Sequence, residues 1–380
     1  MTRTRERIRI GILGASGYTG ADLVRLLAPR RDVEIALLTA ERQRGKSIER
    51  VFPQFAGLDL PDLIGLDEVE WPALDLDVVF CALPHATSQE VIRGLLHATR
   101  HSLLDELMME TLEDMAASVP RSDLRIIDLS ADFRLADPKT YEEWYGRPHQ
   151  APDLQPRAIY GLSEWNREAI RDARLVACPG CYPTAVLLAL LPLIAGQDGP
   201  LIDPEHLVID AKSGVSGAGR SLKPEMLFAE VAESLRPYGV GRHRHMPEME
   251  QELSRALGRA VEVSFTPHLV PMNRGELVTC HLKLAAGATV ADLRKALAVR
   301  YADEPFVHVP SDDHVPATRD VRGSNRAVIN AFPDRRAGHA IVIAAIDNLV
   351  KGSSGQAIQN MNLMLGLPEN QGLEACPIFP

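Results

Sequence analysis

A cysteine stands where a helix is expected to begin, in the segment Cys178-Pro-Gly-Cys181-Tyr-Pro183. Pro183 suits the first turn of a helix, so the thiol of Cys181 would lie beside free N–H groups at the positive end of that helix. Such surroundings lower the pKa of a thiol and favour the thiolate, which is the nucleophilic form. Cys181 is therefore the candidate nucleophile. The competing interpretations are a small core residue without chemistry and a redox pair with Cys178.

Two histidines and a carboxylate lie together in His243-Arg-His245-Met-Pro-Glu248, at the start of a second predicted helix. A histidine pair in this position could supply a general acid–base group, and the sequence does not decide between His243 and His245. The same histidines could join Cys178 and Cys181 around zinc. A zinc site usually shows a second ligand pair at regular spacing, and no second Cys-x-x-Cys is present, so we expect no metal.

A glycine-rich turn, Gly14-x-x-Gly17-x-x-Gly20, separates a short apolar run from a segment with helical spacing of its apolar residues. Glycine allows backbone N–H groups at a helix start to approach a pyrophosphate closely, because no Cβ stands in the way. In this strand–turn–helix setting the pattern predicts dinucleotide binding, with a tight turn alone as the alternative.

The stretch that follows the second predicted strand bears on the choice of cofactor. Arg42, Arg44 and Lys46 could pair with a 2′-phosphate, whereas an acidic residue such as Glu41 is typical of sites for NAD. The basic residues favour NADP, and a solvated charged loop is the alternative.

The elements that must position these residues alternate between strands and helices. Alternation of this kind predicts an α/β fold, namely a doubly wound, mostly parallel sheet followed by a strand-rich α+β domain, with the change of domain near residues 177–181. Strands are expected at Ile8–Leu13, Val33–Leu38, Val78–Leu83, Leu124–Leu129, Leu207–Ala211, Glu262–Phe265, Leu277–Leu284 and Ile341–Ile346. Helices are expected at Ala21–Leu27, Met108–Pro120, Pro183–Leu193 and Pro247–Leu257.

Composition excludes several classes of protein. The chain has 380 residues and a formal net charge of −10, which disfavours sequence-independent nucleic-acid binding. No apolar run reaches the roughly 18 residues that a membrane span needs. Five scattered cysteines do not form a secreted disulfide framework, so we expect a cytoplasmic enzyme with reduced thiols.

These motifs, taken together and in this order, resemble the N-acetyl-γ-glutamyl-phosphate reductase family, within the aspartate-semialdehyde and glyceraldehyde-phosphate dehydrogenase superfamily. The resemblance covers nearly the whole chain. Its further segments are Ala82–His85, Asp128–Arg134, Tyr160–Leu162, Gly214–Gly219, Pro267–Gly275, Asp347–Gly352 and Gly355–Ala357.

The resemblance implies NADPH-dependent reduction of N-acetyl-L-glutamyl 5-phosphate, through a thioester on Cys181, with a catalytic histidine among His243 and His245. The residues that it implies for NADP(H) are Gly14, Ala15, Ser16, Gly17, Tyr18, Thr19, Gly20, Thr39, Arg42, Arg44, Pro84, Asn348 and Gly352. Those that it implies for the substrate are Arg134, Arg220, Glu248 and Arg274.

The resemblance also implies a domain division and an assembly. Residues 1–178, completed by a C-terminal helix within 350–380, would form the dinucleotide-binding domain of Rossmann type. Residues 179–349 would form the catalytic and oligomerisation domain of glyceraldehyde-phosphate dehydrogenase type, in a homodimer or homotetramer.

Three features depart from the family pattern, and one of them is the stretch around His97–Pro120, which is longer than typical. Cys178 stands where the family usually has asparagine, and Ala40-Glu41 stands where it usually has Ser-Arg, which weakens the preference for NADP over NAD. The alternatives are a reductase of carrier-protein-linked aminoadipyl phosphate, an aspartate-semialdehyde dehydrogenase, and a nucleotide-binding regulator without enzymatic activity.

Overall fold

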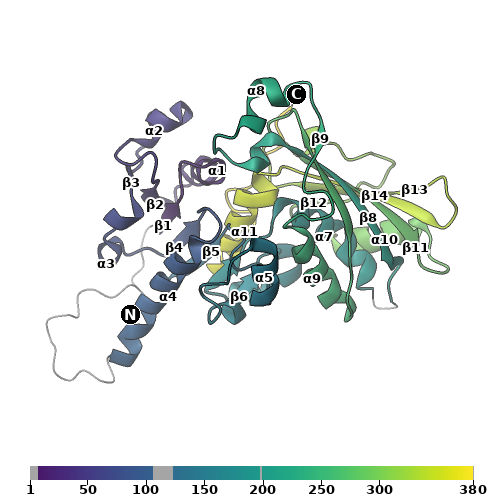
Figure 1. The fold of residues 1–380 in the computed structure, drawn as a ribbon, viewed down its shortest axis with the longest axis horizontal. Helices are drawn as coiled ribbons and strands as arrows, with labels where there is room; N and C mark the ends of the chain where they lie inside the picture. Colours follow the sequence, from purple (N-terminus) through teal and green to yellow (C-terminus); the bar gives the residue numbers. More distant parts are fainter. Residues whose placement is uncertain (1–6, 106–122, 197–198, 380) are drawn as a thin grey trace. The chain divides into compact units, whose positions relative to one another are not determined.

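The computed structural model describes residues 7–105, 123–196 and 199–379, and the chain divides into two compact units (Figure 1). The first unit comprises Met1–Cys178 and Ala357–Gly372, and the second comprises Pro179–Gln356 and Leu373–Pro380. The helix expected at Met108–Pro120 lies wholly outside the described residues. No helix within the described ranges combines the length and apolar character that crossing a membrane requires.

The first unit is built on a seven-stranded sheet in the order β3-β2-β1-β4-β5-β7-β6, in which every neighbouring pair is parallel. The central strand β4 is fully buried, as expected for a parallel sheet with both faces covered. The predicted Rossmann-type sheet is confirmed. Its strands are β1 (Ile8–Leu13), β2 (Val33–Thr39), β3 (Leu63–Ile64), β4 (Val78–Cys81), β5 (Arg125–Asp128), β6 (Ala158–Tyr160) and β7 (Leu175–Ala177).

Helices of the first unit follow the strands along the chain. The first of them, α1, begins directly after the glycine turn, as the apolar spacing predicted. The helices are α1 (Tyr18–Leu27), α2 (Ile48–Val51), α3 (Trp71–Leu74), α4 (Ser88–Asp105), α5 (Pro138–Tyr145) and α6 (Ser163–Arg171), and a late segment of the chain adds α11 (Gly355–Met364).

Polar side chains of α11 are hydrogen-bonded to the first unit. The amide of Asn360 donates to the carbonyl oxygen of Gly161 (2.9 Å) and accepts from the hydroxyl of Ser163 (2.7 Å), and all of these bonds are buried. Buried amides that satisfy both donor and acceptor contribute specificity as well as stability. The first unit is therefore discontinuous in sequence.

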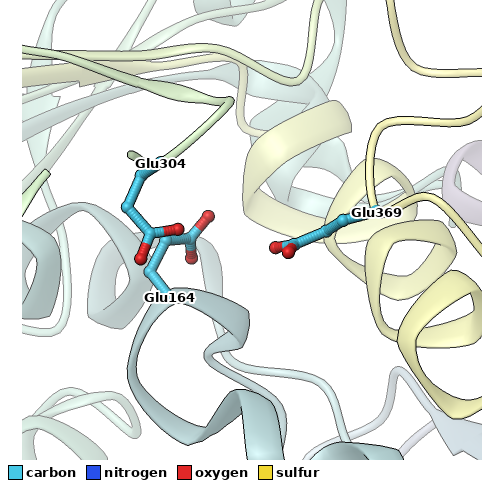
Figure 2. A group of neighbouring side chains, drawn as sticks. All are labelled: Glu164, Glu304 and Glu369. Carbon is cyan, nitrogen blue, oxygen red and sulfur yellow. The ribbon is translucent and has the colours of Figure 1, made fainter. Parts of the chain in front are cut away.

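A second contact of the same kind joins α6 to the turn after α11. The amide of Gln359 donates to the carboxylates of Glu164 (2.9 Å) and Glu369 (2.7 Å), which Figure 2 shows as sticks. Arg167 forms an ion pair with Glu369 at 2.9 Å. These bonds fix residues 357–372 against α6.

The second unit contains a mixed seven-stranded sheet in the order β12-β13-β14-β11-β8-β10-β9. The pairs β10–β8 and β12–β13 are parallel and the other pairs are antiparallel. The predicted α+β domain is confirmed. The strands are β8 (Ile202–Gly214), β9 (Arg236–Pro237), β10 (Ser264–Val270), β11 (Glu276–Leu284), β12 (Val307–His308), β13 (Ala327–Pro333) and β14 (His339–Ile346).

Helix α7 (Cys181–Ile194) is buried on all sides, from Tyr182 to Ile194. It packs on β8, β11 and β14, and it contacts both α9 (Met246–Leu257) and α10 (Val290–Arg300). A helix that is apolar around its whole circumference belongs in a core. The sheet and the two flanking helices therefore hold the first residue of α7, Cys181, in a fixed position. The unit also contains α8 (Phe228–Val231) and a π-helical turn, η7 (Val350–Ser354).

Strand β10 differs from its expected span of Glu262–Phe265, because it runs from Ser264 to Val270 and includes Pro267. A proline within a run usually argues against a strand, since it cannot donate to the ladder. Here the carbonyl oxygen of Pro267 accepts from Tyr238 N–H, so the strand continues with β9 alongside it.

Candidate active site

The candidate nucleophile Cys181 is the first residue of α7, and it is partly exposed. Gly180 caps the helix with its backbone, and its N–H donates to Oε1 of Glu248 at 2.8 Å. The carbonyl oxygen of Gly180 accepts from both the N–H and the hydroxyl of Thr184, each at 2.9 Å. These bonds hold the Cys181 side chain at the positive end of the helix, where a thiolate is favoured.

His245 lies against this turn. A Cβ built on Gly180 would be 2.6 Å from Nε2 of His245, so the ring can occupy its place only because residue 180 is glycine. His245 is also the residue that caps α9, and Glu248 lies in the first turn of the same helix. The starts of α7 and α9 therefore lie side by side. The ring of His245 contacts Gly180, which is the residue directly before Cys181.

His243 has different surroundings. Its ring lies edge-on to the rings of Tyr182, Tyr238 and Phe265, and its Nδ1 accepts from the N–H of His245 at 3.2 Å. Burial, with a smaller contribution from the charge of Arg244, lowers the pKa of His243 to about 4. His243 is thus held neutral and packed, whereas His245 faces the nucleophile turn.

Gly352 lies in the π-helical turn η7, and this turn also contacts Cys181. A Cβ at residue 352 would be 2.7 Å from Cβ of Cys181. Single π-helical turns are frequent at functional sites. Gly352 was expected to contact the cofactor, and in the structure its absent side chain makes room for the nucleophile.

Asn348 and Asp347 organise the turn that carries Arg274. The amide of Asn348 accepts from Gly275 N–H (2.8 Å) and donates to the hydroxyl of Ser216 (2.9 Å). Asp347 is fully buried, and one of its oxygens lies 3.4 Å from Nη1 of Arg274. Arg274, predicted to bind substrate, is thus oriented by a buried carboxylate in the same unit as Cys181.

Two further residues predicted to bind substrate have contrasting positions. Glu248 is only 1% exposed and is bonded to Gly180 N–H, so it supports the nucleophile turn. Arg220 is exposed, in the segment that follows the short helical turn Val215–Ala218.

One residue near Cys181 was missed by sequence reasoning. Glu276 is the first residue of β11, it is 0% exposed, and the Cys181 side chain is close enough to affect its ionisation. A glutamate at the start of an apolar strand pattern is the signal that could have identified it.

The glycine turn of the first unit has the geometry that a dinucleotide needs. Gly14 has φ +84°, and a Cβ there would lie 2.3 Å from the carbonyl oxygen of Ala82. The N–H of Gly14 donates to the hydroxyl of the buried Thr39, and a Cβ on Gly20 would be 2.5 Å from the Gly14 carbonyl oxygen. No side chain caps α1 at Gly17. The turn is therefore shaped to present backbone N–H groups to a pyrophosphate.

The residues expected at the adenosine end of the cofactor differ in their partners. Arg44 pairs with Asp67, with Glu41 (3.2 Å) and with Glu68 (3.5 Å). Arg42 is exposed on the same loop. Arg44 is therefore held by three carboxylates, whereas the Arg42 side chain is open to solvent. The other predicted contacts, from Ala15 to Thr19 and Pro84, lie in the glycine turn and directly after β4.

Arg134 lies in the first unit and is 8% exposed. Its Nε donates to the carbonyl oxygen of Cys178 (2.8 Å) and its Nη2 to that of Leu129 (3.2 Å). Cys178 is itself buried, and its N–H donates to the carbonyl oxygen of Asp128. Arg134 thus holds the segment that precedes Cys181, and neither Cys178 nor Cys181 forms a disulfide within the described residues.

Comparison with known proteins identifies close relatives over the whole length. A protein from Rhodospirillum rubrum named "N-acetyl-gamma-glutamyl-phosphate reductase" is 53% identical and covers 99% of each chain. A "probable N-acetyl-gamma-glutamyl-phosphate reductase, chloroplastic" from Arabidopsis thaliana is 49% identical over 100% of this chain and 87% of its own.

Family profiles match both units. The profile described as "Semialdehyde dehydrogenase, NAD binding domain" matches residues 9–105, and "Semialdehyde dehydrogenase, dimerisation domain" matches residues 181–348.

Solved structures with the same fold are aspartate semialdehyde dehydrogenases. The Candida albicans enzyme with NADP has a TM-score of 0.65 at 16% identity and covers 96% of this chain and 99% of its own. The Vibrio cholerae enzyme II has a TM-score of 0.64 at 16% identity, with coverage of 95% and 99%. At this identity the likeness concerns the fold.

Proposed function

The chain belongs to the N-acetyl-gamma-glutamyl-phosphate reductase family, and we propose the residues through which it carries out that family's reaction. It reduces N-acetyl-L-glutamyl 5-phosphate to N-acetyl-L-glutamate 5-semialdehyde and releases phosphate, a step of arginine biosynthesis. The observation that carries this function is the 53% identity that extends over 99% of both chains.

Cys181 is the nucleophile. Its sulfur attacks the acyl carbon of the substrate, the bond from that carbon to the phosphate oxygen breaks, and a thioester remains on Cys181. A bound nicotinamide cofactor supplies the hydride that reduces this thioester. The position of Cys181 at the start of α7, between His245 and Gly352, supports its role.

His245 is the acid–base group. When the thioester is reduced, its carbonyl oxygen gains negative charge, and a protonated imidazole beside it can stabilise or protonate that oxygen. The ring contact between His245 and Gly180 supports this assignment. Arg274, Arg220 and Arg134 remain candidates for the phosphate and the α-carboxylate, because guanidinium groups pair with both in bidentate geometry.

The chain binds a nicotinamide cofactor, and NADPH is the form that we propose. The glycine turn and the start of α1 would hold the pyrophosphate, and Arg42 would hold the 2′-phosphate. Glu41 forms an ion pair with Arg44 of the same loop, so its carboxylate has a cationic partner within that loop.

The protein is a homo-oligomer through its second unit, and we assign a dimer. The matched profile is that of a dimerisation domain. On β8 the apolar side chain of Val208 is 47% exposed. Light scattering should therefore give about twice the chain mass of 41.7 kDa.

The function is tested by running the reaction backwards, with the semialdehyde, phosphate and either NADP or NAD. Wild-type protein should reduce NADP only when phosphate is present, and Cys181→Ser should lower kcat by at least about 10³-fold because it removes the nucleophile. Cys280→Ser, at a buried thiol on β11, is the matched control and should retain activity.

Two results would contradict this proposal. Turnover of aspartate semialdehyde in place of the acetylated glutamate compound would establish the neighbouring activity. Full activity of Cys181→Ser would remove this cysteine from the mechanism.

A further inference from the structure

A turn of the first unit, residues 84–87, follows β4 at the place where the sheet changes direction. Strand β1 pairs with β2 on one side and with β4 on the other, so the order of the strands reverses between β1 and β4. Open parallel sheets bind their ligands at such a switch point, beyond the carboxyl ends of the strands. The glycine turn follows β1 at this edge, and the turn 84–87 follows β4 beside it.

The end of β4 is packed directly against the glycine turn. The N–H of Ala82 donates to the carbonyl oxygen of Leu13 at 2.9 Å, and the carbonyl oxygen of Ala82 occupies the space that a Cβ on Gly14 would need. Arg42, at the adenosine end, follows β2 on the opposite side of β1. With the pyrophosphate at the glycine turn, the nicotinamide end of the cofactor would therefore lie over β4, beside the turn 84–87.

Ala86 in this turn has a backbone conformation that alanine rarely adopts. Its φ is +70°, in the left-handed region where the Cβ of any residue other than glycine is crowded. The side chains around it, those of Pro84, His85 and Thr87, are exposed. Such a conformation persists only where the surrounding structure holds it, and it occurs preferentially where a ligand is bound.

Asp132, in the segment that follows β5, holds Ala86 in this conformation. Both of its carboxylate oxygens accept from the N–H of Ala86, at 2.7 and 2.8 Å. Asp132 is 0% exposed, and its Oδ1 also accepts from the hydroxyl of Tyr141 at 2.9 Å. Hydrogen bonds to an ionised acceptor are shorter and stronger than those between neutral groups, so this carboxylate can offset the strain at Ala86.

The backbone around Asp132 is itself fixed. The N–H of Asp132 donates to the hydroxyl of Ser130 at 3.1 Å, and its carbonyl oxygen lies 2.7 Å from Nε2 of His149. The N–H of Ala131 donates to Nδ1 of His85 at 3.1 Å. The segment after β5 therefore holds two successive residues of the turn from a rigid position.

We propose that Asp132 is a positioning residue for the nicotinamide cofactor. By holding Ala86 in the left-handed conformation, its carboxylate keeps the exposed turn 84–87 in the shape that contacts the nicotinamide end. The turn is formed before the cofactor arrives, so binding does not have to order it. This inference rests on the proposed function and adds a residue to its cofactor site.

The test measures the binding of the cofactor without substrate. NADPH and, in parallel, NADH are titrated by their nicotinamide fluorescence, with circular dichroism as the control for folding. Asp132→Asn keeps the shape of the side chain but is uncharged and has a single acceptor oxygen, so we expect Kd for the reduced cofactor to rise about five- to tenfold. Adenosine 2′,5′-bisphosphate and ADP carry no nicotinamide, and their Kd values, measured by calorimetry, should stay unchanged.

Three further variants make the result specific. Ala86→Gly adopts the left-handed conformation without crowding, so adding it to Asp132→Asn should recover part of the lost affinity. Ala86→Val opposes that conformation and should raise Kd by itself; if Asp132→Asn does not fold, an unchanged Kd in Ala86→Val would overturn the proposal. Glu164→Gln neutralises another buried carboxylate of the first unit, on α6, and should leave Kd unchanged.

The proposal also fails if folded Asp132→Asn binds the reduced cofactor as wild type does, or if it loses the adenosine compounds equally, since the substitution would then act on the whole unit. The proposed function fails separately, because the titrations need no acyl phosphate. A wild-type protein that does not turn over the acetylated semialdehyde refutes the function whatever the titrations show. Normal turnover together with an unchanged Kd in Asp132→Asn refutes only the role of Asp132.

Discussion

At the scale of single residues, the site separates two histidines that are only two positions apart. His243 lies among aromatic rings, and its low pKa of about 4 means that it carries no extra proton at neutral pH. His245 lies against Gly180, beside the nucleophile. This difference in position is the reason that we propose His245, and not His243, as the acid–base group.

Single substitutions distinguish the two histidines. His245→Asn should lower kcat by about 10²–10⁴-fold, the usual range for the loss of a general acid–base group. His243→Asn should change kcat by much less and should act mainly on stability. Steady-state kinetics of both variants, with circular dichroism as the control for folding, make the comparison. A greater loss of kcat in His243→Asn would reverse the assignment.

The sequence correctly placed Cys181 at a helix start, because a proline and the apolar run after it are local features, and its role as nucleophile stays a prediction. It left the histidine pair undecided, since the difference between His243 and His245 arises from Tyr182 and Phe265, which lie far away in sequence. Glu276 was missed for the same reason. It begins β11, and that strand packs against α7 from a distant part of the sequence.

At the scale of elements, the site depends on two helix starts that meet. Glu248 of α9 accepts from the N–H of Gly180, the residue that precedes α7. One helix therefore satisfies a buried donor at the beginning of the other. Its role is to fix the backbone that carries Cys181.

Replacement of Glu248 tests this connection. Glu248→Ala leaves the N–H of Gly180 buried without an acceptor, which should lower the free energy of unfolding by about 1–3 kcal/mol. Glu248→Gln retains an acceptor oxygen and should lose less. Urea denaturation of both variants gives the comparison, and equal stability of Glu248→Ala and wild type would contradict the structural role.

Sequence periodicity located most of the elements that support the site. The strand at Ile8–Leu13 and the helices near residues 183–193 and 247–257 were predicted to within a few residues, because apolar spacing is strong there. Strand β10 was predicted too short, since Pro267 interrupts the pattern. The strand β13 was missed, although its first five residues are buried.

At the scale of the whole molecule, the first unit depends on residues from both ends of the described chain. Arg30, directly after α1, donates to Asn362 of α11 (2.9 Å) and to the carbonyl oxygen of Gln371 (3.0 Å). Together with the contacts of Asn360 and Gln359, these bonds tie residues 357–372 to the segment after α1 and to the start of α6.

Truncation tests this dependence. A chain that ends after Gln356 should lose the folded first unit, because α11 leaves several buried polar groups without partners. A chain that ends after Gly372 should keep it. Limited proteolysis, read by mass spectrometry, should show cleavage within residues 7–178 only in the shorter chain. Equal protection in both chains would show that the first unit folds without α11.

The interrupted first unit has a consequence for synthesis on the ribosome. Residues 179–356 must all be translated before α11 emerges, and at about 5–20 residues per second this takes on the order of 10–40 s. During that interval the nascent parallel sheet lacks one of its helices. We therefore expect a chaperone that binds exposed apolar surface on nascent chains to bind the N-terminal half of this polypeptide.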